Sequence, residues 1–362
     1  MFAHILPQDA WPLDKFKCDF KTVEAASNYM PMETVNVVIV HGPTCVDGLA
    51  AAAIACMAMT DIRVIPMEAG GDVPEVPEDA SVLMVDVSPR DVEALLELKS
   101  RCGDLAILDH HESCRQQLSN YKGVFVTEYL SGATAMAAYR QFCDPGAITN
   151  VNYHAILKVV EARDTFNWDD FKDESFKHRA RRVAVVINAL VTTNDYQDTE
   201  AFTHPGIPFQ KWHGHVALMR LLLLDRGMLT CIEADPIGIL EPYDLKVAEL
   251  IDSASSSNIL LPNKTVIPVT LVRPSENGTH TDQKVCISDA GLALAEKFKK
   301  PVAFVTQSEA TLWVSVRSIA SAESALFIAM QFGGGGHRNA AGFNLPCSEN
   351  PFLDHDQINS DR

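Results

Sequence analysis

The sequence has no hydrophobic run long enough to cross a membrane, and it has fewer basic residues (30) than acidic residues (47). Its most apolar segment, residues 49–59, is shorter than the roughly 20 residues that a transmembrane helix needs. Residues 1–17 have neither the charged and then apolar layout of a secretion signal nor the arginine-rich character of a transit peptide. These absences predict a cytoplasmic protein that has no association with membranes.

The excess of acidic residues excludes another class of protein. A formal net charge of −17 argues against a protein that coats long nucleic acid, because such proteins present a broad basic face. A small phosphorylated substrate is not excluded, because metal ions and a few arginines can create a local positive site. We therefore expect a short nucleic acid or nucleotide as the partner, with no long duplex DNA. The sequence leaves the oligomeric state open.

The cysteines also lack a pattern. There are nine, an odd number, and no two form a CxxC pair. This usage is typical of a reducing compartment rather than of a disulfide scaffold.

The pattern of the chain predicts an α/β protein. Its 362 residues are enough for two domains. From residue 35 to about 130, short apolar runs alternate with helical segments, which predicts a parallel sheet with helices on both faces. We expect a parallel-sheet domain at 1–145, a helical linker region at 146–258, a smaller C-terminal α/β domain at 259–346 and a flexible tail at 347–362.

Individual elements can be predicted within these regions. Strands are expected at 35–40, 62–67, 81–87, 105–108 and 124–127, and helices at 48–60, 90–100, 132–142, 151–163, 174–192, 209–232 and 243–252. A serine-rich stretch at 253–258 indicates a domain boundary. Beyond it we expect apolar segments at 265–272 and 285–287, a helix at 289–299, strands at 302–306 and 312–316, and a helix at 322–331.

One predicted strand runs directly into polar residues. The apolar residues 105–108 are followed at once by Asp109, His110 and His111. In open α/β sheets, ligands bind just outside the carboxyl ends of the strands. Neighbouring Asp and His residues supply metal ligands and proton-transfer groups in one place. The alternative interpretation is a surface turn that happens to contain two histidines.

Other predicted elements end in the same way. Residues 35–40 lead into His41, Cys45 and Asp47, residues 81–85 lead into Asp86, and the helical residues 156–162 lead into Asp164. A run of four glycines at 333–336 precedes His337. In this order the motifs resemble those of the DHH phosphoesterase superfamily, which includes RecJ-type exonucleases, nanoRNase/pAp phosphatases and type II inorganic pyrophosphatases. The resemblance covers about residues 35–345.

The resemblance implies a centre of two divalent metal ions. We expect Mn²⁺, with Zn²⁺, Fe²⁺ and Mg²⁺ as alternatives. Two ions about 3.5–4 Å apart need a bridging carboxylate and several further ligands. The resemblance assigns one ion to His41, Cys45 and Asp86, and the other to Asp47, Asp86, His110 and Asp164, so that Asp86 is the bridge.

The resemblance also implies two catalytic residues beside the metals. Asp109 would orient a neighbouring histidine, and His111 would face the substrate phosphate. One position departs from the usual pattern, because Cys45 stands where the superfamily carries an aspartate. A thiolate is a softer ligand that suits Zn or Fe better than Mg or Mn. The alternatives are that Cys45 is an inert small residue and that Asp47 only caps the helix that follows it.

The C-terminal domain carries the residues expected to bind the substrate. The run of glycines before His337 resembles the GGGH motif of the DHH-associated domain, and such a loop can hold a phosphate with its backbone N–H groups. Residues 314–318 resemble the Ser-x-Arg-Ser strand of the same domain, in which Arg317 could bind a phosphate in bidentate fashion. The expected substrate-binding residues are Arg317, Ser318, Gly334, Gly335, Gly336 and His337. A glycine-rich linker and a solvated arginine are the alternatives.

These features predict a hydrolase, namely a metal-dependent phosphodiesterase or phosphatase. An exonuclease would be one such enzyme. Its substrates would be short oligonucleotides, dinucleotides or pAp-like nucleotides. The alternatives are an inorganic pyrophosphatase or polyphosphatase, a nucleotide-binding relative weakened by Cys45, and a thiolate–metal site that is only structural.

Overall fold

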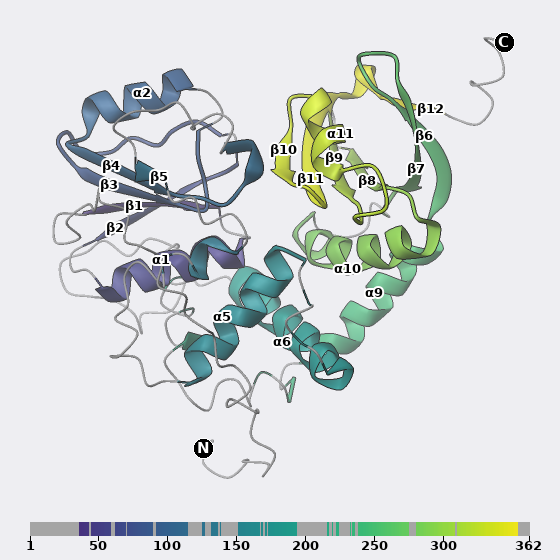
Figure 1. Cartoon of the computed structure of the whole chain (residues 1–362), viewed down its shortest axis with the longest axis horizontal. Coiled ribbons are helices and arrows are strands. Elements are labelled where there is room, and N and C mark those ends of the chain that lie inside the picture. The colour runs from purple at the N-terminus through teal and green to yellow at the C-terminus, as the bar shows by residue number, and fades with distance from the viewer. Residues whose placement is uncertain are drawn as a thin grey trace. The chain divides into compact units, whose positions relative to one another are not determined.

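The computed structural model describes two compact units, residues 1–237 (the first unit) and 238–362 (the second unit) (Figure 1). The described residues are 36–42, 45–58, 62–69, 71–89, 92–114, 125–126, 132–136, 138, 151–166, 168, 171, 173–193, 216, 219, 222–223, 232, 234–235, 238–274, 280–307 and 310–353. The predicted helices at 132–142 and 209–232 lie largely outside these residues.

The first unit contains a five-stranded sheet in the order β2-β1-β3-β4-β5. Every pairing between neighbouring strands is parallel. The strands are β1 (Val37–His41), β2 (Arg63–Met67), β3 (Ser81–Val85), β4 (Asp104–Leu108) and β5 (Phe125–Val126). Most of their side chains are buried, as expected for parallel strands that are covered on both faces. The predicted α/β fold class is confirmed.

Helices cover both faces of this sheet (Figure 1). On one face, α2 (Val92–Arg101) buries Leu95 and Leu98 against the strands. On the other face, α1 (Val46–Ala58) contacts β1 and β3. The next helices, α5 (Val151–Asp164) and α6 (Glu174–Thr193), contact α1 in turn. Residues 151–193 of the segment expected to be a linker therefore pack as part of the first unit, and its last residues, from 238, belong to the second.

The register of the strands brings their polar ends together. Val40 of β1 lies opposite Val85 of β3, and Val85 lies opposite Leu108 of β4. The residues at the ends of these strands therefore leave the sheet at one edge. The strand order also reverses between β1 and β3, because β2 lies on the far side of β1. The crevice at such a reversal is where parallel sheets bind ligands.

The second unit is built on a seven-stranded mixed sheet in the order β10-β11-β9-β8-β7-β6-β12. Its elements are α9 (Leu240–Asp252), β6 (Ser255–Leu260), β7 (Val266–Val272), α10 (His280–Phe298), β8 (Val302–Gln307), β9 (Thr311–Arg317), α11 (Ala325–Gln331), β10 (Gly335–His337), β11 (Ala340–Pro346), the 3₁₀ helix η5 (Cys347–Glu349) and β12 (Phe352–Leu353).

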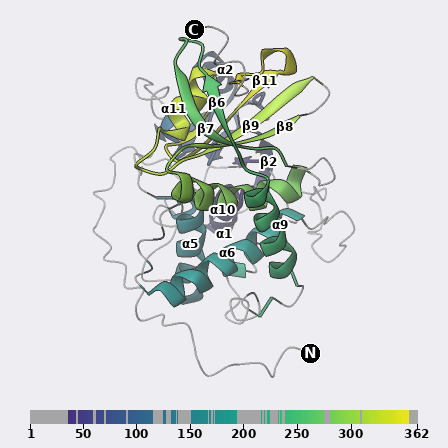
Figure 2. The same ribbon diagram turned by 90° about the vertical axis from the view of Figure 1, so that its right-hand side faces the viewer.

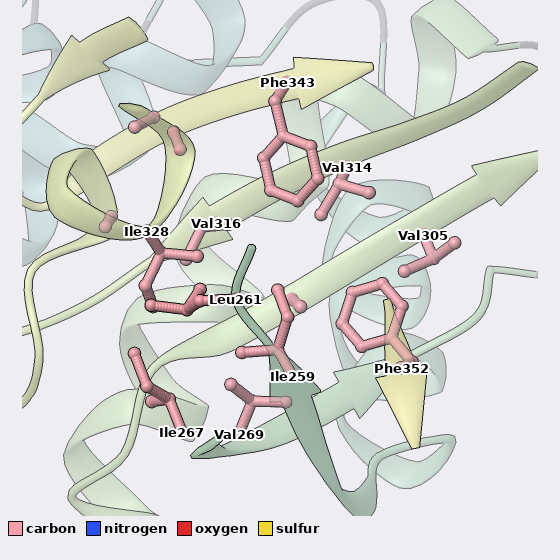
Figure 3. Packing of buried hydrophobic residues seen from close by; sticks show 14 of the residues in the cluster. Ile259, Leu261, Ile267, Val269, Val305, Val314, Val316, Ile328, Phe343 and Phe352 are labelled. Atoms are coloured by element: carbon pink, nitrogen blue, oxygen red, sulfur yellow. The ribbon is translucent and has the colours of Figure 1, made fainter. Parts of the chain in front are cut away.

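Two helices enclose the sheet of the second unit. On one face, Ile328 of α11 joins Val314 and Val316 of β9 and Phe343 of β11 in the core shown in Figure 3. On the other face, α10 contacts β7, β8 and β9, and α9 packs against α10 (Figure 2). Among the described residues of both units, no helix has the length and hydrophobicity that crossing a bilayer requires.

Three segments of the second unit differ from the expectations. Residues 255–258 of the serine-rich stretch belong to β6, in which Ser257 and Ile259 are buried. The apolar segment at 285–287 lies inside α10, which begins before the predicted helix at 289–299, and Cys286, Ala290 and Leu294 follow each other at helical spacing. The predicted tail at 347–362 begins with η5 and β12, and Phe352 of β12 pairs with β6 and is buried.

Candidate metal centre

The first unit brings its predicted ligands together. Three groups of side chains each have their ligand atoms within 4.8 Å of one another. They are His41, Cys45 and Asp86; Asp47, His110 and Asp164; and Asp86, Asp109 and His111. Each of these residues lies at or just after the end of a strand, at the start of α1 or at the end of α5. The convergence follows from the shared edge of β1, β3 and β4.

Asp86 lies between the first two groups. Its Oδ2 atom is 3.1 Å from Nδ1 of His41 and accepts a hydrogen bond of 2.9 Å from the thiol of Cys45. Its Oδ1 atom lies 3.2 Å from Nε2 of His110. The two oxygens of one carboxylate thus face different groups of ligands.

The backbone of Asp86 is also unusual. Its φ of +61° lies in the left-handed region, which asparagine and aspartate tolerate better than other non-glycine residues. The backbone N–H of Asp86 donates to the carbonyl of Leu108 on the neighbouring strand. This turn directs the side chain across the end of the sheet.

His110 is the centre of the second group. Its Nε2 atom lies 3.1 Å from Asp164, 3.2 Å from Asp86 and 3.6 Å from Asp47. Burial alone would lower the pKa of His110, but the nearby carboxylates of Asp164 and Asp86 outweigh it and raise the pKa. Three carboxylates therefore converge on one imidazole.

The carboxylate of Asp47 contacts a distant segment of the chain. Its Oδ2 atom accepts a hydrogen bond of 2.7 Å from the backbone N–H of Thr134, and its Oδ1 atom accepts one of 2.9 Å from that of Ala135. The hydroxyl of Thr134 donates to Oδ1 of Asp86 at 3.1 Å. Sequence analysis missed these contacts, because nothing in the sequence relates residue 134 to residues 47 and 86.

Asp109 and His111 form a separate pair beside the ligands. Asp109 lies 2.7 Å from Nδ1 of His111 and accepts a hydrogen bond of 2.6 Å from the hydroxyl of Ser88, a contact that was not predicted. Burial alone would lower the pKa of His111, but the charge and hydrogen bond of Asp109 raise it to about 9. In the metal-free protein the raised pKa therefore favours the cationic imidazole of His111 at neutral pH, and Asp109 orients the ring.

This pair predicts how the stability of the metal-free protein depends on pH. The pKa of folded His111, about 9, lies above its ordinary value of 6.5, so its contribution is complete below pH 6.5 and is lost as the pH rises through 9. We expect this contribution to be about 1–3 kcal/mol of unfolding free energy. Denaturant titrations in a chelator should show a smaller decrease over this range for His111→Gln than for the parent. Equal decreases would show that the Asp109 pair does not hold His111 protonated.

The donor atoms fit bound divalent ions in spacing and in charge. Ligand atoms that share one ion at about 2.0–2.3 Å lie roughly 3–3.7 Å apart, and the contacts of Asp86 and His110 fall between 2.9 and 3.6 Å. Burial raises the pKa of Cys45 and of Asp47, and the neighbouring negative charges of Asp86 and Asp164 raise both further. Cations would relieve this repulsion, and binding at Cys45 would displace its proton.

The predicted substrate residues lie in the second unit. Arg317, at the end of β9, donates to the carbonyl of Val316 and, at 3.4 Å, to the hydroxyl of Ser288. Its side chain lies across Gly291 of α10, where a Cβ atom would be 2.6 Å from Cγ of Arg317. Ser318 is buried and accepts a hydrogen bond from the first N–H of α11.

The glycine run is not the open loop that we expected. The N–H groups of Gly333 and Gly334 donate to the last turn of α11, and Gly335 and Gly336 begin β10, which pairs with β11. A Cβ atom on Gly334 would lie 2.2 Å from the carbonyl oxygen of Gly342. The glycines therefore let two segments of backbone approach closely, and His337 is the last residue of the edge strand β10.

The first unit has the α/β fold that the sequence predicted, and its motifs converge at one edge of the sheet. No family model and no curated protein sequence matches the chain. Several solved structures do match the chain.

Three of the matched structures cover most of this chain. An uncharacterized protein from Helicobacter pylori G27 has 12% identity and a TM-score of 0.31, over 90% of this chain and 97% of its own. The pGpG-specific phosphodiesterase PggH from Vibrio cholerae has 10% identity and a TM-score of 0.46, and the match covers 90% of this chain and 96% of PggH. RecJ from Thermus thermophilus in complex with Mg²⁺ has 16% identity and a TM-score of 0.39, and the match covers 85% of this chain and 46% of RecJ. At such values, the assignment of a function rests on the residues of this chain.

Proposed function

We propose that the protein is a metal-dependent phosphodiesterase that hydrolyses short oligonucleotides, dinucleotides or pAp-like nucleotides. One observation carries the proposal: the two oxygens of Asp86 face two different groups of ligands, at 2.9–3.2 Å. A carboxylate in this position could bridge two metal ions, with one oxygen bound to each. His41 and Cys45 would complete one site, and Asp47, His110 and Asp164 would complete the other.

The residues around this centre have distinct tasks in the proposed reaction. Bound divalent ions would polarise the phosphoryl oxygens and supply a nucleophile at neutral pH. His111, oriented by Asp109, would donate a hydrogen bond to the substrate phosphate and stabilise its developing charge. Ser88 would hold Asp109 in place.

Arg317 and His337 of the second unit support a nucleotide as the substrate. A planar guanidinium binds phosphate oxygens in bidentate fashion, and an imidazole can hydrogen-bond a phosphate or a base. Together they would hold the part of the substrate that lies away from the reacting phosphorus, which would limit the length of the substrate. Mn²⁺ is the ion we expect first, and the thiolate of Cys45 favours a test of Zn²⁺ beside it.

A direct test compares two substrates. The purified protein is loaded with Mn²⁺, Mg²⁺ or Zn²⁺, and the release of mononucleotides from a dinucleotide is measured beside the release of phosphate from pyrophosphate. We expect the dinucleotide to be hydrolysed faster. Faster turnover of pyrophosphate would indicate a phosphoanhydride hydrolase. Bound metal without turnover of either substrate would indicate a nucleotide-binding relative.

Arg317 offers a prediction about substrate binding. Arg317→Ala should raise the KM for a dinucleotide by roughly 10–100-fold, the effect of losing a charged hydrogen bond, and should leave kcat nearly unchanged. Steady-state kinetics beside Arg273→Ala, which removes an exposed arginine of the same unit, provide the control. If kcat decreased at constant KM, Arg317 would take part in the chemical step.

A second variant tests the same role without removing the arginine. Alanine is normally a better helix former than glycine, but a Cβ atom at Gly291 would lie 2.6 Å from Cγ and 2.8 Å from Cβ of Arg317. Gly291→Ala should therefore displace Arg317 and raise the KM in the same direction. An unchanged KM would show that the position of this side chain does not matter for binding.

A further inference from the structure

Thr134 contacts both groups of candidate ligands and belongs to neither. Its hydroxyl donates to Oδ1 of Asp86, and its backbone N–H donates to Oδ2 of Asp47. Its side chain is fully enclosed, with 1% of the residue exposed. The contacts join segments 87 and 48 residues apart in the sequence.

The hydroxyl contact determines how Asp86 can turn. Oδ2 of Asp86 is held by His41 and Cys45. Oδ1 is held by Thr134 at 3.1 Å and faces His110 at 3.2 Å. A carboxylate without the Thr134 contact could rotate about its last torsion, which has a broad energy profile. Oδ1 would then no longer be directed at the second group.

The two contacts of Thr134 can be separated by mutation. Valine has nearly the same shape as threonine but lacks the donor, and it keeps the backbone N–H that binds Asp47. Thr134→Val therefore removes the contact with Asp86 alone. Serine keeps both contacts.

We propose that Thr134 is a positioning residue that fixes the bridging orientation of Asp86 and thereby couples the binding of the two ions. This inference rests on the proposed two-metal function. It assigns to Thr134 no contact with the substrate and no direct bond to a metal. Residues that orient metal ligands typically contribute 10–100-fold in metal affinity.

The test is a metal-binding titration of the full chain. Mn²⁺ and Zn²⁺ are titrated separately into the chelator-treated parent, Thr134→Val and Thr134→Ser, and calorimetry gives the number of ions and the affinity of each step. We expect two ions in the parent. In Thr134→Val, the affinity of the weaker step should fall by about 10–100-fold, and the two steps should become independent. Thr134→Ser should restore the parent's isotherm.

A control variant and the number of ions bound by the parent distinguish failure of this inference from failure of the two-metal function. Thr270→Val makes the same change at a buried threonine of the second unit and should leave the isotherm unchanged. If the parent binds two ions and Thr134→Val binds them with the same affinities, the inference about Thr134 is wrong and the two-metal function stands. If the parent binds no more than one ion, the two-metal function itself is wrong.

Discussion

Asp86→Asn is expected to abolish turnover and to release both metal ions. One carboxylate would serve both sites, so neutralising it weakens each, whereas the loss of a terminal ligand weakens only one. Metal ions contribute several kcal/mol of transition-state stabilisation, which corresponds to a loss of about 10³-fold or more in kcat. Metal content after dialysis and turnover of a dinucleotide measure the two effects.

Asparagine is the appropriate substitution because of the backbone at this position. Asp86 has a φ of +61°, and asparagine tolerates this conformation better than alanine does. Asp79→Asn provides the matched control, since Asp79 has a φ of +59° and is exposed outside the site. It should retain metal and activity. Full turnover in a folded Asp86→Asn protein would refute the bridging role.

Cys45 carries the second large prediction. Cys45→Ala should reduce the bound metal from two ions to about one per chain, because only the second group of ligands stays complete. Cys45→Asp should restore a harder first site and raise the activity supported by Mn²⁺ relative to that supported by Zn²⁺. Metal content and turnover in each ion, measured for all three proteins, test both statements.

The thiolate has a signature that does not depend on activity. Co²⁺ bound to a thiolate gives a charge-transfer band in the near ultraviolet, which should be present in the parent and absent in Cys45→Ala. Cys56→Ala removes a cysteine of α1 that lies outside the ligand groups and should keep the band. If Cys45→Ala equals the parent in metal content and activity, Cys45 is a packing residue. If only Cys45→Asp is active, the parent is a disabled relative that binds nucleotides.

Much of the first unit could be predicted from its sequence. Buried parallel strands are nearly continuous apolar runs, so β1, β3 and β4 are easy to locate. A polar residue that follows such a run must lie at the end of the sheet, which places His41, Asp86 and Asp109 together. Their grouping into sets of ligands came from the resemblance to a family, and the roles of these residues stay predictions.

Other parts could not be predicted, for physical reasons. Thr134 and Ser88 act through hydrogen bonds to side chains far away in the sequence, and no local pattern encodes such contacts. The serine-rich β6 has low hydrophobicity, and only its alternating burial makes it a strand. The glycines at 333–336 suggested an open loop, but close backbone packing of Gly334 on β11 requires the same residue type.

The division between Ile237 and Gly238 separates two properties of the proposed enzyme. The predicted ligands of the two ions, from His41 to Asp164, precede it, and the residues proposed to hold the distal part of the substrate follow it. Each unit also has a hydrophobic core of its own. Substitutions that retune the choice of substrate can therefore accumulate in the second unit while the metal chemistry of the first is inherited unchanged. Such modularity would let one hydrolytic centre serve different nucleotides in different descendants of the same ancestral gene.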